Sequence, residues 1–143
     1  MYRLRVRPAQ LSDADAMFHL LRGFAMSHEP VRSAFNGSYP RILENVRADL
    51  LVAEQGGAVA GYVLASDSLT LFANGVVTEL MELFVEEEPR GRGTGRELVG
   101  QAVVGARDRG AIEITAPTTR ARSFYLSLGF QFTAEFFKLD LQT

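Results

Sequence analysis

One stretch of the sequence constrains the fold more than any other part of the chain. An apolar run from Leu80 to Val85 is followed by three glutamates, by a turn rich in arginine and glycine, and by a helical pattern from Glu97 to Arg109. This order predicts a strand, a tight turn and a helix. The first amides of a helix have no acceptor inside the helix, and glycine lets an anion approach them. The stretch therefore predicts an anion site at a helix N-terminus, and phosphate is the anion that suits it best.

The arginines of the turn support this interpretation. Arg90, Arg92 and Arg96 surround the positive end of the predicted helix. Cations are disfavoured there by roughly 0.3–1 kcal/mol each, unless an anion lies among them. The plainer alternative is that the glutamates at 86–88 neutralise these arginines on a solvated surface.

The composition is that of a single globular domain spanning residues 1–143. The hydrophobic fraction is 47% and the charged fraction is 22%, both ordinary for such a domain. A net charge of −2 gives no general attraction to nucleic acid or to an anionic membrane. The apolar runs are much shorter than the ~20 residues that span a bilayer, and no secretory signal follows Met1. We therefore expect a cytoplasmic protein without nucleic-acid or membrane partners.

The sequence has no cysteine and only two histidines, His19 and His28. Disulfides, thiolate metal ligands and a cysteine nucleophile are therefore excluded. No spacing typical of a metal site occurs, so we expect no metal. A single histidine carries little specificity, and both are interpreted as structural or exposed.

The pattern along the chain predicts a mixed α/β sheet, a single layer with helices on both faces. Residues 29–39 are expected to be polar and irregular, with a turn at Asn36-Gly37, and residues 67–75 either extend two strands or form a loop. The predicted elements are a strand at 2–7, a helix at 12–28, a helix from 40 to 50, strands at 51–54, 58–66 and 76–85, a helix at 97–109, a strand at 111–116, a short helix at 121–128, and one or two strands at 132–141.

Two common phosphate-binding turns do not fit the arginine-glycine stretch. A P-loop needs Gly-Lys followed by Ser or Thr, which the chain lacks. The dinucleotide fingerprint G-x-G-x-x-G lacks its third glycine, whether it starts at Gly91 or at Gly93. Glu113 follows at the distance of a ribose-binding acid, but it lies inside its predicted strand.

The third candidate is coenzyme A, and here the sequence resembles the GNAT superfamily of N-acetyltransferases. Arg90-Gly91-Arg92-Gly93-Thr94-Gly95 matches the signature [Arg/Gln]-x-x-Gly-x-[Gly/Ala], and Leu83-Phe84-Val85 matches the end of the strand before it. Ala121 with the run from Phe124 to Phe130 matches the family's C-terminal pattern. The run from Arg5 to Asp13 resembles its opening strand and first helix cap. The resemblance covers essentially all 143 residues.

Three positions depart from the family pattern. Thr94 is polar where the family usually has an aliphatic residue, and Pro89 lies two positions later than the proline that often follows the strand. Thr118 replaces an asparagine common after the penultimate strand. The last departure puts in doubt a contact with the cofactor or with the neighbouring strand.

The resemblance implies a GNAT-like central mixed sheet of six to seven strands, with acetyl-CoA as donor and a small-molecule or peptide primary amine as acceptor. The main chain of the strand end would bind the pantetheine arm as an added strand does, and the amides of the turn would hold the pyrophosphate. The implied cofactor-binding residues are Leu83, Phe84, Val85, Arg90, Gly91, Arg92, Gly93, Thr94, Gly95, Arg96 and Thr118.

The reaction needs a neutral amine, and a lysine-like amine has a pKa of about 10.4, so a base or a water chain must take a proton. Glu79 and Glu82 are the candidates, because a carboxylate in an apolar strand is costly unless it is paired or useful. Strict alternation places the two on opposite faces, although a β-bulge would change this. The resemblance leaves both open, and each could instead only pair with an arginine.

Tyr125 stands where the family often has the acid that serves the leaving thiolate, and its hydroxyl can donate. The alternative is a tyrosine that packs with Phe124 and Phe130. Because the chain has no cysteine, a cysteinyl intermediate is excluded. We therefore expect direct attack in a ternary complex.

Two other functions compete with catalysis. The chain would also bind coenzyme A as a non-catalytic acyl-CoA sensor, and the apolar residues of 132–141 would suit a partner-binding scaffold or a homodimer. The identity of the acceptor amine stays open.

Overall fold

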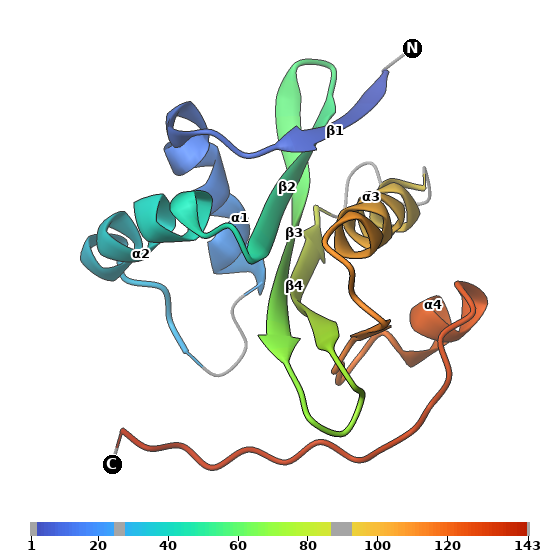
Figure 1. Cartoon of the computed structure of the whole chain (residues 1–143). Helices are drawn as coiled ribbons and strands as arrows, with labels where there is room; N and C mark the ends of the chain where they lie inside the picture. Colours follow the sequence, from blue (N-terminus) through green and yellow to red (C-terminus); the bar gives the residue numbers. More distant parts are fainter. Residues whose placement is uncertain (1–2, 25–27, 87–92, 143) are drawn as a thin grey trace.

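The structure, a computed structural model, describes residues 3–24, 28–86 and 93–142 (Figure 1). In chain order, the elements are β1 (Leu4–Pro8), the 3-10 turn η1 (Leu11–Asp13), α1 (Ala14–Phe24), α2 (Arg32–Glu44), β2 (Ala48–Gln55), β3 (Ala58–Leu69), β4 (Val76–Val85), α3 (Thr94–Asp108), β5 (Glu113–Thr115) and α4 (Arg122–Ser127).

The strands form one mixed sheet in the order β1-β2-β3-β4-β5. The first four are antiparallel neighbours, and β5 pairs with β4 in parallel. The predicted hairpin at residues 51–66 is confirmed, and its turn has Gly56 and Gly57 at φ of 59° and 80°. Two positive φ values at the centre of a two-residue loop match the twist of the flanking strands, and glycine adopts them without strain.

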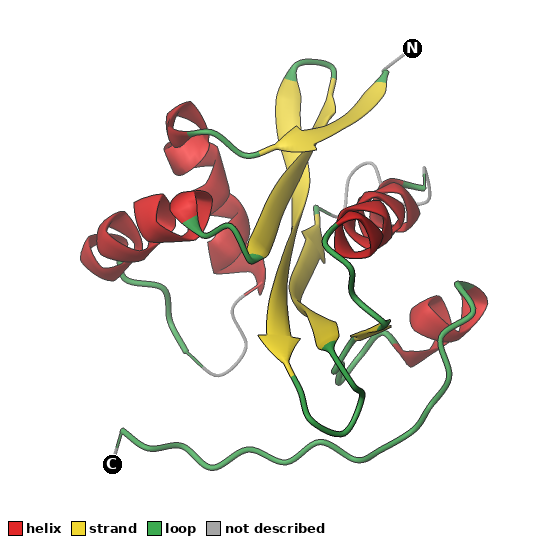
Figure 2. Cartoon of the chain, viewed as in Figure 1, coloured by secondary structure: helices red, strands yellow, loops and turns green. Residues whose placement is uncertain are grey.

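Helices cover both faces of the sheet, as predicted (Figure 2). The helices α1 and α2 lie on one face, and α3 and α4 lie on the other. Each face has its own apolar core. The buried residues on the α1/α2 face are Met17, Leu20, Tyr39, Leu50, Val52, Tyr62 and Leu64. Those on the α3/α4 face are Ala53, Val63, Ala65, Leu80, Leu98, Val99, Ala102 and Tyr125.

The expectation of an irregular segment at 29–39 is wrong, because α2 already begins at Arg32 and contains Pro40. The ring of Phe35 stacks on Tyr39 with centroids 4.9 Å apart, and Phe18 of α1 meets Phe35 edge-on at 5.4 Å. Burial of this aromatic cluster favours the helix more than Pro40 disfavours it. Local turn propensity was therefore overridden by packing against α1 and the sheet.

The start of the first helix also differs from the prediction. Ser12 lies inside η1. The cap is a reciprocal pair in which the Asp13 side chain accepts the N–H of Gln10 and the backbone carbonyl of Gln10 accepts the N–H of Asp13. The helix α1 ends at Phe24, and the predicted extension toward His28 falls partly outside the described residues.

The predicted final strands at 132–141 are not formed, so the sheet of the described residues has five strands rather than six or seven. After α4 the chain is extended and runs below the β3–β4 loop, away from the sheet (Figure 1). A strand exists only where its amides and carbonyls pair with a neighbouring edge, and this segment pairs with no strand of the described residues.

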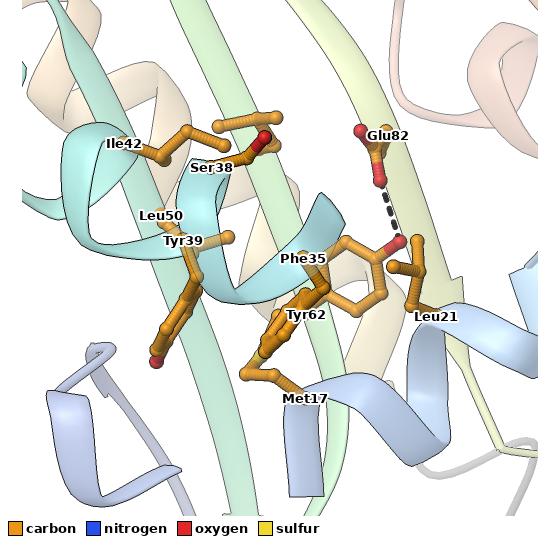
Figure 3. Close-up of a pocket in the computed structure, with 10 residues that line it drawn as sticks. Met17, Leu21, Phe35, Ser38, Tyr39, Ile42, Leu50, Tyr62 and Glu82 are labelled. Carbon is orange, nitrogen blue, oxygen red and sulfur yellow. Dashed lines mark hydrogen bonds between the residues drawn. The ribbon is translucent and has the colours of Figure 1, made fainter. Parts of the chain in front are cut away.

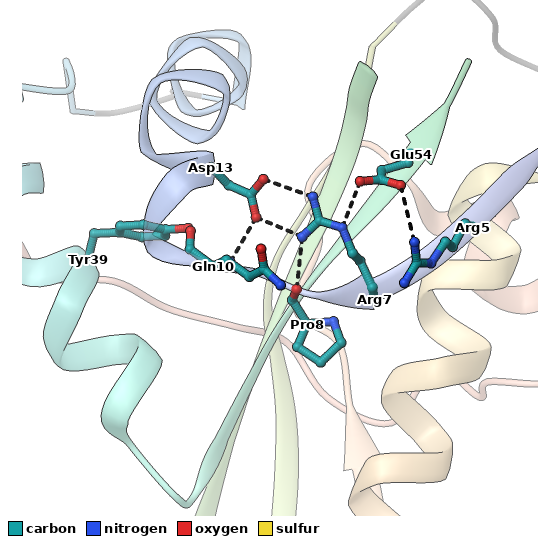
Figure 4. Close-up of polar contacts among 7 residues, drawn as sticks. All are labelled: Arg5, Arg7, Pro8, Gln10, Asp13, Tyr39 and Glu54. Carbon is teal, nitrogen blue, oxygen red and sulfur yellow. Dashed lines mark hydrogen bonds and ion pairs between the residues drawn. The ribbon is translucent and has the colours of Figure 1, made fainter. Parts of the chain in front are cut away.

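Arg7 joins β1 to the start of α1 (Figure 4). Its Nη1 and Nη2 donate to the two carboxylate oxygens of Asp13 at 2.8 and 2.9 Å, and its Nε donates to Glu54 of β2 at 2.7 Å. Asp13 also accepts the N–H of Gln10 at 2.8 Å. The hydrogen bond from Arg7 is the main reason that the pKa of Asp13 is below its usual value. This pairing fixes where α1 leaves the sheet edge.

Arg109 joins the far end of α3 to the sheet. Its Nε and Nη2 donate to Asp67 at 2.7 and 3.0 Å, and its Nη1 donates to Asp49. Thr78 of β4 donates to the same Asp67 carboxylate at 2.7 Å. The pKa of Asp67 is lowered, mainly by the hydrogen bond from Arg109.

Within the described ranges, none of the helices combines the length and the apolarity needed to cross a bilayer.

Arg7→Met is expected to lower the free energy of unfolding near neutral pH by about 2–3 kcal/mol, because the buried Asp13 carboxylate loses its cation. The folded pKa of Asp13 is depressed, so this stabilisation is present above the unfolded value of 3.8 and is lost as the pH falls through the folded pKa. Urea denaturation at neutral pH and at about pH 3 measures both effects, and the difference from the parent protein should shrink at low pH.

The matched control is Arg5→Met. The Arg5 side chain is 69% exposed and lies 4.0 Å from Glu54, so its removal should change the free energy of unfolding by less than about 0.5 kcal/mol. Equal losses in the two variants would contradict the role given to Arg7.

Candidate active site

One edge of β4 is open over half its length. The strand pairs with β3 from Val76 to Val85, but β5 pairs only with Val77–Glu79. From Leu80 to Val85, no strand among the described residues lies along the other edge. Alternate N–H and C=O groups of this stretch point away from β3. An extended chain or ligand can therefore pair with this part of β4 as an added strand does.

The helix that follows begins near the end of this edge. Gly93 has a φ of 78°, its carbonyl accepts the first bond of α3 from the N–H of Glu97, and no side chain caps the helix. Among the described residues, no atom would lie within 4 Å of a Cβ added at Gly93. At Gly95 it would lie 3.3 Å from the ring of Phe124 and 3.9 Å from Val85, so this glycine allows α3 to pack close to β4 and α4. The first turn of α3 thus presents amide groups beside Gly93, where no side chain of the described residues crowds them.

The described residues include only the last part of the arginine-glycine turn, from Gly93 onward. Arg90, Gly91 and Arg92 lie outside the described residues, as do Glu87, Glu88 and Pro89. Arg96 is exposed on the first turn of α3. The described part of the turn therefore supplies the helix start and one exposed cation.

The polar residue at position 94 has a structural explanation. Thr94 is 3% exposed, and its Oγ1 accepts a hydrogen bond from Nε2 of Gln55 at 2.7 Å. Gln55 ends β2, so the bond ties the start of α3 to the sheet. No local pattern in the sequence indicates this partner, because the two residues lie 39 positions apart.

A β-bulge lies in the middle of β4. Leu64 of β3 faces Glu82 and the next residue, Ala65, faces Leu80, so Met81 is the extra residue. The extra residue reverses the alternation of side chains between the two halves of the strand. As a consequence Glu79 and Glu82 point to the same face, the one covered by α1 and α2, whereas strict alternation would separate them.

Glu82 lies at a small pocket on this face (Figure 3). The Tyr62 hydroxyl donates to its Oε1 at 2.7 Å. Tyr62 is almost completely buried, and burial, followed by the charge of Glu82, raises the pKa of Tyr62. The pocket has a volume of about 60 Å³. It is lined by Met17, Leu21, Phe35, Ser38, Tyr39, Ile42, Leu50, Tyr62, Leu64 and Glu82.

Glu82 supplies the one carboxylate of this pocket, and most of the other lining side chains are apolar. A half-buried carboxylate favours a cation, and Tyr62 fixes one of its oxygens so that the other is left to act. Glu79, by contrast, faces Ser66 of β3, is half-buried and has no hydrogen bond or ion pair among the described residues. It does not line the pocket.

Tyr125 lies on the opposite face of the sheet, in α4. It is 8% exposed and meets the rings of Phe124 and Phe130 edge-on, with centroids 5.1 and 5.2 Å apart. Burial raises its pKa, so the hydroxyl keeps its proton at neutral pH. Tyr125 belongs to the same core cluster as Leu80 of β4. Tyr125 therefore lies on the α3/α4 face of β4, whereas Glu82 lies on the α1/α2 face.

Thr118 serves the turn before α4. Its Oγ1 accepts the N–H groups of Ala121 at 3.0 Å and of Arg120 at 3.3 Å, and the residue is exposed. The two histidines are also exposed, and His19 lies 3.3 Å from Glu86, an ion pair when it is protonated. Among the described residues, no group of three His, Asp or Glu side chains is arranged to hold a metal ion.

Comparison with known proteins shows the family of the chain. A family model described as the Acetyltransferase (GNAT) family matches residues 14–130. No curated protein matches the sequence.

Several solved structures share the fold. A transcriptional regulator from Bacillus halodurans C-125 has a TM-score of 0.87 at 24% identity, covering 97% of this chain and 100% of that one. A glucosamine-6-phosphate N-acetyltransferase from Arabidopsis thaliana has a TM-score of 0.87 at 15% identity, with coverage of 98% and 99%. An aminoglycoside N-acetyltransferase in complex with CoA has a TM-score of 0.87 at 17% identity, with coverage of 100% and 97%.

Proposed function

The chain belongs to the GNAT family of acetyltransferases, and we propose that it moves an acetyl group from acetyl-CoA to a primary amine by direct attack in a ternary complex. The observation that carries this proposal is the open edge of β4, which ends near the uncapped first turn of α3. Coenzyme A has an amide-containing pantetheine arm and a pyrophosphate group. The open strand edge suits the arm, and the free amides at the helix start suit the pyrophosphate.

The donor is proposed to lie along this edge. The main chain of Leu83, Phe84 and Val85 pairs with the pantetheine arm, while their side chains keep their places in the two cores. The amides from Gly91 to Arg96 hold the pyrophosphate, which the helix dipole favours. The open space in front of Gly93 fits this role, since a bulky anion needs room at the amides. Thr118 contributes through the turn that it holds.

The proposal explains why three arginines lie near the N-terminus of α3, where the helix dipole disfavours cations. The attraction of the charges of Arg90, Arg92 and Arg96 to a bound pyrophosphate would outweigh the unfavourable helix dipole.

The acceptor is proposed to reach the thioester from the α1/α2 face. The pocket at Glu82 holds the group that carries the amine, and the free carboxylate oxygen of Glu82 binds the ammonium and takes its proton. The neutral nitrogen then attacks the thioester carbonyl carbon, and it releases its second proton to solvent as the carbon–sulfur bond breaks. Glu79, on the same face, is the alternative base, acting through water.

Tyr125 is proposed to serve the leaving group from the opposite face. When the carbon–sulfur bond breaks, the sulfur becomes a thiolate, whose conjugate thiol has a pKa of about 8.5. Burial raises the pKa of Tyr125 above its ordinary value of 10.0, so complete proton transfer to sulfur would be uphill. The hydroxyl therefore stabilises the developing thiolate by donating a hydrogen bond, and the final proton comes from solvent.

The second candidate function is a non-catalytic acyl-CoA sensor. The packing of Tyr125 between two phenylalanines favours it, because a purely structural tyrosine would show the same contacts. A sensor would bind coenzyme A and release no free thiol with any amine.

Coenzyme A is expected to raise the melting temperature of the protein, because it binds only the folded state. Gly93→Glu should abolish this shift, since it places a carboxylate in the space proposed for the pyrophosphate. Gly100→Glu is the matched control, because a side chain at position 100 on α3 meets open space. Differential scanning fluorimetry gives the answer, and a native protein that shows no shift would remove the basis of the proposal.

Tyr125→Phe is expected to lower kcat by about 10²-fold while leaving the KM for acetyl-CoA nearly unchanged, because only the hydroxyl is lost. Thiol release with a reactive amine measures both constants. The melting shift with coenzyme A should persist, which shows that the site still folds. An unchanged kcat would assign Tyr125 to packing alone.

Glu82→Gln is expected to lower kcat/KM for the amine by at least about tenfold, because the carboxylate that takes the ammonium proton is lost. Glu79→Gln is the paired variant on the same strand face, and it should keep more than about half of the activity. A panel of primary amines assayed by thiol release provides the measurement. The reverse order of losses would make Glu79 the base.

A further inference from the structure

The pocket at Glu82 extends across the sheet from β4 to β2. Leu50 of β2 pairs with Leu64 of β3, and Leu64 pairs with Glu82 of β4, so the three side chains form one row on the α1/α2 face. Neighbouring strands lie about 4.8 Å apart, so the row spans about 10 Å. The carboxylate is at the end of the row on β4, the strand with the open edge, and the end on β2 is apolar.

Few polar groups line the pocket, and most of them already have partners. The Tyr39 hydroxyl donates to the backbone carbonyl of Gln10 at 2.5 Å and points away from Glu82 (Figure 3). The Tyr62 hydroxyl donates to Oε1 of Glu82. The polar groups left to a ligand are the other carboxylate oxygen of Glu82 and the hydroxyl of Ser38, an exposed residue. The other lining residues are apolar, namely Met17, Leu21, Phe35, Ile42, Leu50 and Leu64.

This lining discriminates among the bodies that can carry an amine. Among the described lining residues there is no lysine, no arginine and no acid besides Glu82. The second ammonium of a diamine, the hydroxyls of an amino sugar and the carboxylate of an amino acid would therefore lose their water without gaining a partner, which is costly. An apolar body has no such cost and gains free energy when it leaves water.

The size of the pocket limits the length of that body. Its volume of about 60 Å³ has room for about four to six groups of the size of a water molecule. The unbranched side chain of Met17 on one wall can adjust to the shape of the body.

We propose that the acceptor is a primary monoamine with an apolar body of about four to six carbon atoms. Its ammonium binds the free oxygen of Glu82, and its body lies along the row toward Leu50. This orientation places the nitrogen on β4, beside the open edge proposed for the donor, and keeps the body away from it. The inference rests on the proposed acetyl transfer and names the class of acceptor for the same site.

Two amines of equal length test the proposal, because n-pentylamine ends in a methyl group where butane-1,4-diamine has a second ammonium. With acetyl-CoA, kcat/KM measured by thiol release should be at least about tenfold higher for n-pentylamine. From n-propylamine to n-pentylamine, kcat/KM should rise by about fourfold for each added methylene. An equal or higher value for the diamine would overturn the proposal.

A second carboxylate in the lining should change this preference. Ser38→Asp adds one at an exposed position of α2, so it should raise kcat/KM for the diamine relative to n-pentylamine by about threefold or more. Ser33→Asp is the matched control, because Ser33 is also exposed on α2 but does not line the pocket. An unchanged ratio in Ser38→Asp, or the same change in both variants, would show that the lining does not select the body of the acceptor.

A binding measurement separates this proposal from the catalytic one. With coenzyme A in place of acetyl-CoA no transfer occurs, so the additional melting shift caused by each amine reports binding alone. The shift should be larger with n-pentylamine than with butane-1,4-diamine at equal concentration. That order without thiol release from acetyl-CoA would support the apolar acceptor pocket and reject acetyl transfer. Thiol release that favours the diamine would reject the apolar acceptor and leave acetyl transfer standing, and a lack of both signals would overturn both.

Discussion

The site depends on the short parallel pairing between β4 and β5. Only three residues of β4, Val77–Glu79, are held by β5. If the ladder continued to Val85, the amides and carbonyls along the inner edge of β4 would be used inside the protein, and the two faces of the sheet would be closed off from one another. Because it stops at Glu79, the last half of β4 is bonded on one side only. The strand is then part of the core and, in the proposed function, also the binding surface for the donor.

The β-bulge at Met81 gives this strand its chemistry. Without the extra residue, Glu82 would point toward α3 with Leu80, into an apolar core where a carboxylate is costly. With it, Glu82 reaches Tyr62 and the pocket on the α1/α2 face, while Leu83 and Val85 return to the α3/α4 core. One residue in the register thus decides whether a charge destabilises the fold or is available to a ligand.

The sequence was sufficient to predict those elements whose local residue pattern matches their environment in the fold. The bounds of β4 at Val76–Val85 were predicted, and so was the hairpin closed by Gly56 and Gly57. It was insufficient where distant residues decide. The helix α2 forms around Pro40 because Phe35 and Tyr39 pack on α1. The partners of Glu82 and Thr94 are 20 and 39 positions away in sequence. Periodicity carries no information about such pairs, and a bulge that reverses alternation leaves no mark in composition.

The ion pairs of Arg109 with Asp67 and Asp49 have a consequence for the proposed anion site at the N-terminus of α3. Asp67 and Asp49 fix the last turn of α3 to the sheet, and Gln55 fixes Thr94 at its first turn. A helix attached at both ends cannot tilt or slide when an anion arrives. Its amides are already oriented, so binding of the proposed anion would cost little conformational entropy. The affinity would then reflect the interaction itself rather than the ordering of the protein. The ion pairs of Arg109 would thus favour binding of the proposed anion indirectly, because they hold α3 in the orientation that binding needs.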